Sequence, residues 1–185
     1  MICGVDEAGP GPLAGPVFAA AVILDPNNKI KGLMDSKKLN THKLSELHLI
    51  IMRDAIEVSV ARASVLEIEN INILQASLLA MKRAINQLKL KPNNVIIDGL
   101  YCPEINNMKM QAIVKGDSKY DEISAASIIA KVERDKFMVE LDKKFPKYKF
   151  KKHKGYPTKE HLSLIMKHGV CEEHRKTFKP INTLI

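Results

Sequence analysis

Tryptophan is absent from this chain of 185 residues, aromatic residues make up only 5% of it, and cysteine occurs three times. Cys3, Cys102 and Cys171 lie far apart and form no CxxC pair, which argues against a disulfide framework or a thiolate zinc site. No apolar run approaches the roughly 18 residues that a membrane-spanning helix needs, and the N-terminus lacks the pattern of a signal peptide. We therefore expect a soluble, cytoplasmic protein without membrane association.

Positive charge is concentrated near the C-terminus. The net charge is +8, and residues 146–185 hold ten Lys or Arg against three Glu. Such a basic block suits nucleic acid, although a solubilising lysine-rich surface would have the same composition. The hydrophobic content of 45% is enough for one main core. We predict a main domain over 1–145 and a basic helical region over 146–185 packed on it.

Apolar runs and helical periodicity alternate along the chain. They predict strands at 2–5, 17–24, 56–61, 94–97 and 108–114, and helices at 41–55, 72–90, 121–145 and 158–168. Thr41, Asp121 and Thr158 are the expected N-caps, and Gly169 is the expected stop. The first strands are joined too closely for helical crossovers, so an antiparallel meander should come first. The expected class is α/β, with a central mixed five-stranded sheet flanked by helices.

The segment GVDEAGPGPLAG (4–15) sets two acids against a loop rich in glycine and proline. A dinucleotide-binding loop is one interpretation, because a GxGxxA pattern follows a predicted strand. That fingerprint needs a helix starting within the loop, whereas Pro12 and Pro16 remove two N–H donors and Pro16 would break such a helix. Asp6 and Glu7 would also repel phosphates. The pattern therefore disfavours a dinucleotide.

Acidic residues fall at the ends of predicted strands. Asp6 and Asp98 each end an apolar strand, and Asp117 follows a third. Together with Glu7 they would form a pocket of four carboxylates suited to two Mg²⁺ or Mn²⁺ ions, although ordinary surface acids would have the same spacing. Neighbouring residues on a regular strand face opposite sides, so Asp6 and Glu7 can share metals only where the strand ends or distorts. We expect the first strand to end there.

Six segments of the chain together resemble ribonuclease HII. They are GVDEAGPGPLAGPV (4–17), DSKKL (35–39), IIDG (96–99), KGDSKYDEISAASIIAKVERD (115–135), HKGYPT (153–158) and HRKTFKP (174–180). The resemblance implies a ribonuclease H-like fold with 1–145 as the catalytic domain. It implies an endoribonuclease, active in replication and repair, that hydrolyses the RNA strand of RNA–DNA hybrids. It would also cut 5′ to single ribonucleotides in duplex DNA, leaving 3′-hydroxyl and 5′-phosphate ends.

The same resemblance implies roles for particular residues. Asp6, Glu7, Asp98 and Asp117 match the catalytic, metal-binding carboxylates. Tyr156 matches the tyrosine that packs on the sugar at the RNA–DNA junction. Gly9, Pro10 and Gly11 match the loop that contacts the 2′-hydroxyl and adjacent phosphates. Further phosphate or supporting contacts are expected from Lys37, Lys38, Lys115, Ser118, Lys119 and Arg134.

This chain departs from the family at one position of that loop. The family has Arg or Lys where this chain has Pro10, so a cationic side chain and a backbone N–H are both missing. We expect weaker substrate binding with the metal site intact.

Several alternatives stay open from the residues alone. A non-catalytic duplex-binding module would use the same basic C-terminal region. His168, Cys171 and His174 are spaced three apart, as in some soft-metal sites, but no fourth ligand is evident. We expect a monomer, and the tail INTLI contains no clear motif for a sliding clamp.

Overall fold

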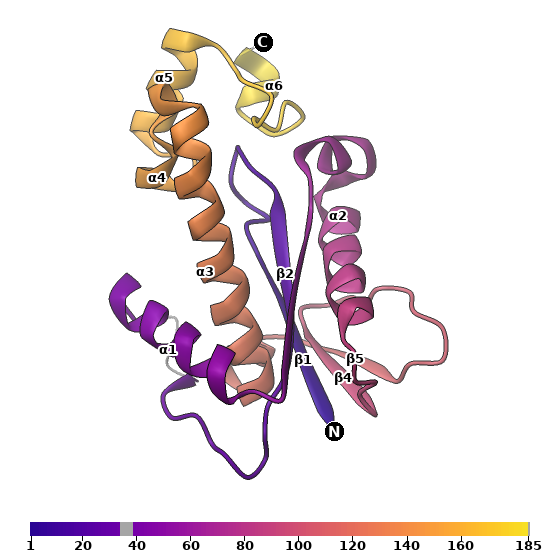
Figure 1. Ribbon diagram of the computed structural model, residues 1–185. Helices are drawn as coiled ribbons and strands as arrows, with labels where there is room; N and C mark the ends of the chain where they lie inside the picture. The colour runs from indigo at the N-terminus through magenta and orange to yellow at the C-terminus, as the bar shows by residue number, and fades with distance from the viewer. Residues whose placement is uncertain (34–38, 185) are drawn as a thin grey trace.

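The computed structural model describes residues 1–33 and 39–184 and contains one mixed sheet (Figure 1). Its strands are β1 (Ile2–Ala8), β2 (Val17–Ile23), β3 (Glu57–Ala63), β4 (Asn94–Asp98) and β5 (Met110–Ile113), in the order β3-β2-β1-β4-β5. β2 pairs antiparallel with β1 and β3, whereas β4 pairs parallel with β1 and β5. The predicted meander and mixed five-stranded sheet are confirmed.

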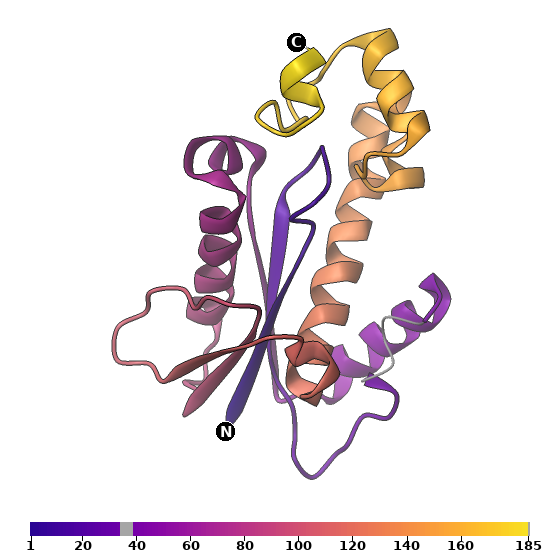
Figure 2. The same ribbon diagram turned by 180° about the vertical axis from the view of Figure 1, so that it is seen from behind.

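Helices cover both faces of the sheet (Figures 1 and 2). One face packs against α2 (Val65–Gln87), and the other against α1 (Thr41–Asp54) and α3 (Asp121–Lys144). The shorter elements are the 3-10 helices η2 (Gly116–Ser118) and η3 (Pro146–Tyr148) and the helices α4 (Phe150–His153), α5 (Lys159–His168) and α6 (Ile181–Leu184). None of the helices in the described ranges is long and apolar enough to cross a membrane.

β2 is the centre of the core because both of its faces are buried. All seven residues of its sequence VFAAAVI are apolar and buried, as expected for a strand covered on both sides. Ala19 and Ala21 pack on the α2 side, and Ala20 packs on the α3 side. These small side chains let helices approach closely from both directions.

The first strand is longer than its sequence pattern indicates. The expectation that β1 ends at the two acids is wrong, because Asp6, Glu7 and Ala8 continue the ladder opposite Ala20, Ala19 and Phe18. The reason is that β2 offers a partner along the whole length of β1. The chain then turns through Gly9 and enters β2 rather than a helix, which contradicts the dinucleotide-binding alternative.

The start of α2 and the N-caps of α1 and α3 differ from those that the sequence pattern predicts. α2 begins before the expected residue 72, because Ser64 and Glu67 form a capping box. Asn72 instead interrupts the helix with a φ of 66°, and its side chain accepts from the Gln75 N–H at 3.1 Å. The N-caps of α1 and α3 are Asn40 and Tyr120, not Thr41 and Asp121. The Thr158 cap and the Gly169 stop are confirmed.

The segment after α3 packs on the loop that joins β1 to β2, named here the glycine-proline loop (residues 9–16). Ala14 lies in a cluster with Met138 of α3 and with Tyr148 and Phe150. Leu13 packs with Ile165 and Ile181 in a second cluster. Both views of the chain show this loop reaching the C-terminal helices, at the opposite end of the sheet from the N-terminus.

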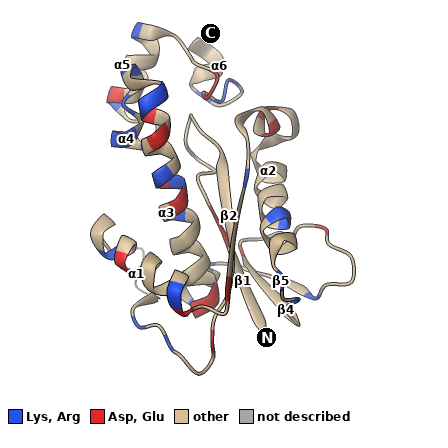
Figure 3. Cartoon of the chain, viewed as in Figure 1, with Lys and Arg blue, Asp and Glu red and all other residues tan. Residues whose placement is uncertain are grey.

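Basic residues lie along α4, α5 and the C-terminal half of α3, with acidic residues between them (Figure 3). Some of these charges are paired, since Lys149 and Lys152 both bind Glu160, and Lys151 lies 3.7 Å from Asp142. The three cysteines are free thiols, as expected.

Gly4 allows the start of α3 to contact β1 directly. A Cβ at Gly4 would overlap the backbone of Glu122 and Ile123, whereas a Cβ at Gly11 would meet no atom within 4 Å. Gly4→Ala should therefore lower the free energy of unfolding by about 1–3 kcal/mol. Gly11→Ala should change it by no more than about 0.5 kcal/mol. Urea denaturation measures both, and equal stability of the two variants would contradict this packing.

Candidate active site

Two of the predicted acids lie side by side at the carboxyl ends of parallel strands. Val5 of β1 pairs with Ile97 of β4, so the next residues, Asp6 and Asp98, are neighbours. Val5 and Ile97 both pack in the core cluster on the α2 side. Because side chains alternate along a strand, Asp6 and Asp98 share the opposite, α3 side. It is β4 rather than β1 that ends here, so Glu7 extends past the last residue of β4.

These carboxylates repel one another, with Asp6 buried and Glu7 and Asp98 partly exposed. Burial raises the pKa of Asp6 well above its ordinary value, and the charges of Glu7 and Asp98 raise it further. Burial and the charge of Asp98 also raise the pKa of Glu7. Two hydrogen bonds lower the pKa of Asp6 and so oppose this rise. One comes from the Ser127 hydroxyl, and the other from the Glu7 N–H, which donates to Asp6 Oδ1 at 2.7 Å. The site therefore favours a positive charge beside these acids.

Asp117 reaches the site through the turn that follows β5. It is buried on η2, and the preceding Gly116 N–H donates to Asp98 Oδ1 at 2.6 Å. A Cβ at Gly116 would lie 2.5 Å from Ile123 Cδ1 and 3.4 Å from Asp98 Oδ1, so the glycine lets this turn pack closely against Ile123 of α3. The turn thereby brings Asp117 to the end of the strand that carries Asp98.

The donor set fits a divalent cation. Its oxygens are hard ligands of the kind that Mg²⁺ and Mn²⁺ prefer, and their mutual repulsion is what a cation would relieve. Across the described residues, no three His, Cys, Asp or Glu side chains are gathered closely enough to form a finished metal site. The contacts above join the acids in pairs, and the sharing of metals by all four remains a prediction.

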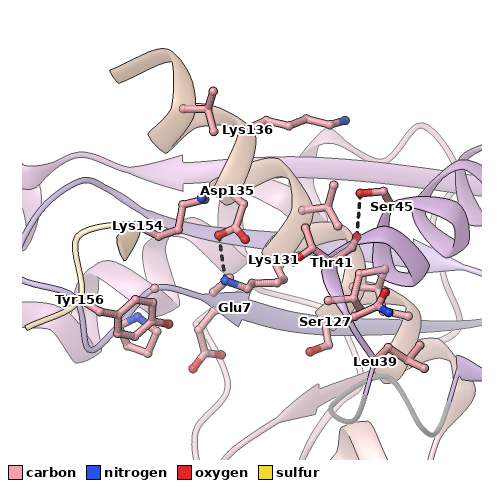
Figure 4. Close-up of a pocket in the computed structure, with 18 of the residues that line it drawn as sticks. Glu7, Leu39, Thr41, Ser45, Ser127, Lys131, Asp135, Lys136, Lys154 and Tyr156 are labelled. Carbon is pink, nitrogen blue, oxygen red and sulfur yellow. Dashed lines mark hydrogen bonds and ion pairs between the residues drawn. The ribbon is translucent and has the colours of Figure 1, made fainter. Parts of the chain in front are cut away.

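A cavity opens beside Glu7 and runs between α1 and α3 (Figure 4). Gly9, Pro10 and Tyr156 line it together with Glu7 and Ser127. The remaining lining mixes apolar side chains, polar side chains and charges of both signs, including Leu39, Leu44, Thr41, Ser45, Lys131, Asp135, Lys136, Glu140 and Lys154. One predicted metal-binding residue, Glu7, thus lines the same cavity as the predicted substrate-binding residues Gly9, Pro10 and Tyr156.

Tyr156 is half-exposed on this cavity, with 41% of its surface accessible. Two cations from α3 flank its ring, with Lys131 Nζ and Arg134 Cζ each 5.9 Å from the ring centroid. Such contacts stabilise an aromatic ring in place without covering it. The ring therefore remains available for stacking.

Two buried arginines hold the glycine-proline loop, a feature that the sequence analysis missed. Arg175 donates to the carbonyls of Gly9 at 2.7 Å, Pro10 at 2.9 Å and Gly15 at 2.7 and 2.9 Å. Burial lowers the pKa of Arg175 to about 9, which still leaves it protonated at neutral pH. Its rigid fork of donors suits several carbonyls at once.

Arg134 also holds this loop, which corresponds to the supporting contact that was one of its two expected roles. Only 1% of its surface is exposed, and it donates to the carbonyls of Ala14 at 3.1 Å, Pro16 at 3.2 Å and Lys154 at 3.0 Å. A Cβ at Gly9, whose φ is 89°, would overlap the Arg134 side chain. Glycine at position 9 is thus required by the arginine beneath it.

Other expected contacts lie elsewhere or outside the described residues. Lys37 and Lys38 belong to residues 34–38, which the structure does not describe. The Ser118 hydroxyl donates to the Lys115 carbonyl at 2.9 Å, and Lys119 Nζ donates to the Val114 carbonyl at 2.8 Å. These bonds close the turn that carries Asp117, and a substrate contact from them stays a prediction.

The C-terminal histidines and cysteine do not form a zinc site. His174 is buried with its Nδ1 3.1 Å from Cys171 Sγ, and its Nε2 lies 3.1 Å from His161 Nε2. His168 instead lies edge-on to Tyr148, 6.3 Å between ring centroids. Each group thus has a protein partner.

The family model described as ribonuclease HII matches residues 3–181. The chain belongs to the ribonuclease HII family. It is 55% identical to ribonuclease HII of Psychromonas ingrahamii over 100% of this chain and 90% of that one. It is 57% identical to ribonuclease HII of Vibrio parahaemolyticus, over 98% and 85% of the two chains.

Solved structures of ribonucleases H have the same fold. Ribonuclease H2 from Pyrococcus horikoshii superposes with a TM-score of 0.82 at 25% identity, over 99% of this chain and 96% of that one. Ribonuclease HII from Archaeoglobus fulgidus, in its PCNA complex, superposes with a TM-score of 0.81 at 26% identity, over 100% of this chain and 96% of that one. Bst-RNase HIII in complex with Mn²⁺ superposes with a TM-score of 0.73 at 18% identity, over 99% of this chain and 68% of that one. This likeness shows the fold alone.

Membership in the ribonuclease HII family confirms the predicted ribonuclease H-like α/β fold and the predicted enzyme class. The chain is a metal-dependent endoribonuclease, a hydrolase that acts on RNA–DNA hybrids. A purely non-catalytic binding module does not agree with this membership.

Two buried histidines should make this ribonuclease sensitive to acid. Burial lowers the pKa of His161 and of His174 from 6.5 to about 4. Between pH 6.5 and pH 4 the unfolded chain binds more protons than the folded protein does. The contribution of the two neutral histidines to the free energy of unfolding is therefore complete above about pH 6.5 and falls as the pH drops toward 4. The slope should reach about 1.4 kcal/mol per pH unit for each histidine.

Urea denaturation between pH 7 and pH 4 measures this loss. The free energy of unfolding is plotted against pH for the wild type and for His174→Gln, and one curve is subtracted from the other. The contribution of the carboxylates, common to both proteins, cancels, and the difference isolates His174. The ring of this histidine faces Tyr148, His161 and Cys171. Identical profiles for the two proteins would show that His174 titrates normally.

Proposed function

We propose that this ribonuclease cleaves hybrids and also nicks duplex DNA on the 5′ side of a single embedded ribonucleotide, leaving 3′-hydroxyl and 5′-phosphate ends. The observation that supports it is the continuous cavity from Glu7, beside the repelling acids Asp6 and Asp98, to Gly9, Pro10 and Tyr156. A charged centre for the phosphodiester and an exposed aromatic ring for a sugar lie on one surface.

The four acids Asp6, Glu7, Asp98 and Asp117 are proposed to hold two divalent cations. Ions so placed supply an activated water and stabilise the leaving oxygen in phosphodiester hydrolysis. The protein's own contribution is rigidity, because strand pairing holds Asp6 and the Gly116 N–H holds Asp98. Asp6 and Asp117 are buried, whereas Glu7 and Asp98 are partly exposed.

Recognition of the ribonucleotide is proposed to come from the other end of the cavity. Only the 2′-hydroxyl distinguishes an isolated ribonucleotide from its deoxy neighbours, so the recognising groups must contact that sugar. Tyr156 presents its ring there, and Arg175 and Arg134 hold the glycine-proline loop by its carbonyls. Lys37 and Ser118 are proposed as further contacts to the substrate.

We also propose how the chain is organised around this site. Residues 1–145 form the catalytic domain, and the basic residues 146–185 add electrostatic attraction for the duplex. The enzyme acts as a monomer, because both ends of the cavity come from one chain.

Asp117→Asn should abolish cleavage without unfolding the protein, because it removes one charge from the metal-binding set at nearly constant size. We expect the single-turnover rate with Mg²⁺ to fall by about three orders of magnitude on a hybrid and on a duplex with one ribonucleotide. The matched control is Asp121→Asn, an exposed acid at the start of α3. Full activity of Asp117→Asn would remove Asp117 from the catalytic set.

Pro10→Arg should strengthen binding of the duplex that contains one ribonucleotide. The side chain at position 10 is exposed on the cavity while its carbonyl is held by Arg175, so a new cation can reach a phosphate without moving the loop. The slope of log affinity against log salt should steepen by about 0.9.

The control for Pro10→Arg is Asn28→Arg, which adds the same charge to an exposed turn away from the cavity. Salt titrations of affinity compare both variants with the wild type. If the slopes and the cleavage rates of Pro10→Arg match those of Asn28→Arg, position 10 has no role in binding.

A further inference from the structure

Three histidines are buried beneath Tyr156, away from the acids. His161 and His174 are fully buried, and the ring of His153 stacks on that of His161 with 4.2 Å between centroids. Tyr148 and Phe150 pack edge-on around them. Neither the metal chemistry nor the sugar contact uses these rings directly, so their hydrogen bonds need another explanation.

The hydrogen bonds assign one tautomer to each ring of the pair. The Cys171 N–H donates to His174 Nδ1 at 2.9 Å, so the proton of His174 must be on Nε2. His161 Nδ1 lies 2.9 Å from the Tyr156 carbonyl, which can only accept, so the proton of His161 must be on Nδ1. The 3.1 Å contact between the two Nε2 atoms is then a donation from His174 to His161.

The result is a directional chain of three hydrogen bonds, from the Cys171 N–H through His174 and His161 to the Tyr156 carbonyl. It is complete only when both rings are neutral. Protonation of either ring would set two N–H groups against each other or remove the acceptor for Cys171. The pKa values of about 4 that burial gives both rings agree with this requirement.

The chain begins in a segment that also holds the glycine-proline loop, residues 171–175, named here the C-terminal anchor. Arg175 directly follows His174 and holds the Gly9 and Pro10 carbonyls. The backbones of the two segments also pair: the Gly15 N–H donates to the Glu173 carbonyl at 2.8 Å, and the Arg175 N–H donates to that of Leu13 at 2.8 Å.

We propose that His161 and His174 are positioning residues for ribonucleotide recognition. They hold the backbone of Tyr156 to the C-terminal anchor, while Arg175 holds the glycine-proline loop to the same anchor. Tyr156 and the glycine-proline loop, the two elements proposed to contact the sugar, are thereby held at a fixed distance from each other. This proposal rests on the role of Tyr156 proposed above.

The first test measures the assigned tautomers in the unmodified enzyme. Nitrogen-15 NMR at pH 7 should show His161 protonated on Nδ1 and His174 protonated on Nε2. The opposite tautomers, or a charged ring in either residue, would overturn the proposal whatever substrate the enzyme cuts. This measurement needs no variant that folds.

The second test separates positioning from simple packing. In His161→Gln the amide replaces Nε2, so the link to His174 can persist while the donor to Tyr156 is lost. The matched control is Tyr148→Phe, which removes one hydrogen bond from the same cluster, the 2.9 Å donation to the Gly169 carbonyl. In His161→Asn the amide replaces Nδ1, which restores the donor to Tyr156.

We expect His161→Gln to raise KM for a duplex with one ribonucleotide about tenfold, the size expected for one hydrogen bond. Its kcat on an uninterrupted hybrid should stay within about twofold of wild type. Tyr148→Phe should change neither value, and His161→Asn should recover most of the KM. Equal effects of His161→Gln and Tyr148→Phe, or equal effects on both substrates, would overturn the positioning role.

A spectroscopic arm distinguishes failure of this proposal from failure of the proposed function. If wild-type enzyme cuts hybrids but not the single ribonucleotide, the proposed function is wrong in that respect. Fluorine-19 NMR of fluorotyrosine-labelled protein then still tests the link, because the resonance of Tyr156 should shift in His161→Gln and not in Tyr148→Phe. An unchanged Tyr156 resonance in His161→Gln would refute the link itself.

Discussion

Repulsion between buried carboxylates is the constraint on which the site depends. Parallel pairing of β1 and β4 makes Asp6 and Asp98 neighbours, and Asp6 is buried there, so the charges of Glu7 and Asp98 disfavour its ionised form. A protein that only had to fold would not place acids there. The Gly116 turn, which donates to Asp98 and carries Asp117, completes the set of acids that we propose to hold the cations.

The proposed recognition of the substrate depends on a second network with a different physical basis. There the fixed groups are backbone carbonyls, which Arg134, Arg175 and His161 bind from beneath. Buried cations without acidic partners can be stable when several carbonyls satisfy every donor. The loop and Tyr156 thus owe their placement to side chains that never face the cavity. The proposed catalytic acids come from β1, β4 and η2, and the proposed sugar contacts come from loops held to the C-terminal anchor.

The sequence predicts some of this and misses the rest for identifiable reasons. Apolar runs followed by acids are a local signal and made Asp6, Asp98 and Asp117 candidates, and the structure places Asp6 beside Asp98 and bonds the turn that carries Asp117 to Asp98. Their role in metal binding stays a prediction. The bonds from Arg134 and Arg175 to the glycine-proline loop could not be predicted, since their partners in that loop lie at least 118 residues away in the chain. The full length of β1 could not be predicted either, because its last residues are in a strand only through their pairing with β2.

Crystals of the enzyme soaked with Mn²⁺, measured at the manganese absorption edge, test the central claim most directly. The account predicts two anomalous peaks about 3.5–4 Å apart, bound by Asp6, Glu7, Asp98 and Asp117. Loss of one or both peaks in Asp117→Asn would support the assignment. Manganese bound away from these four acids, in an enzyme that still cleaves hybrids, would contradict it.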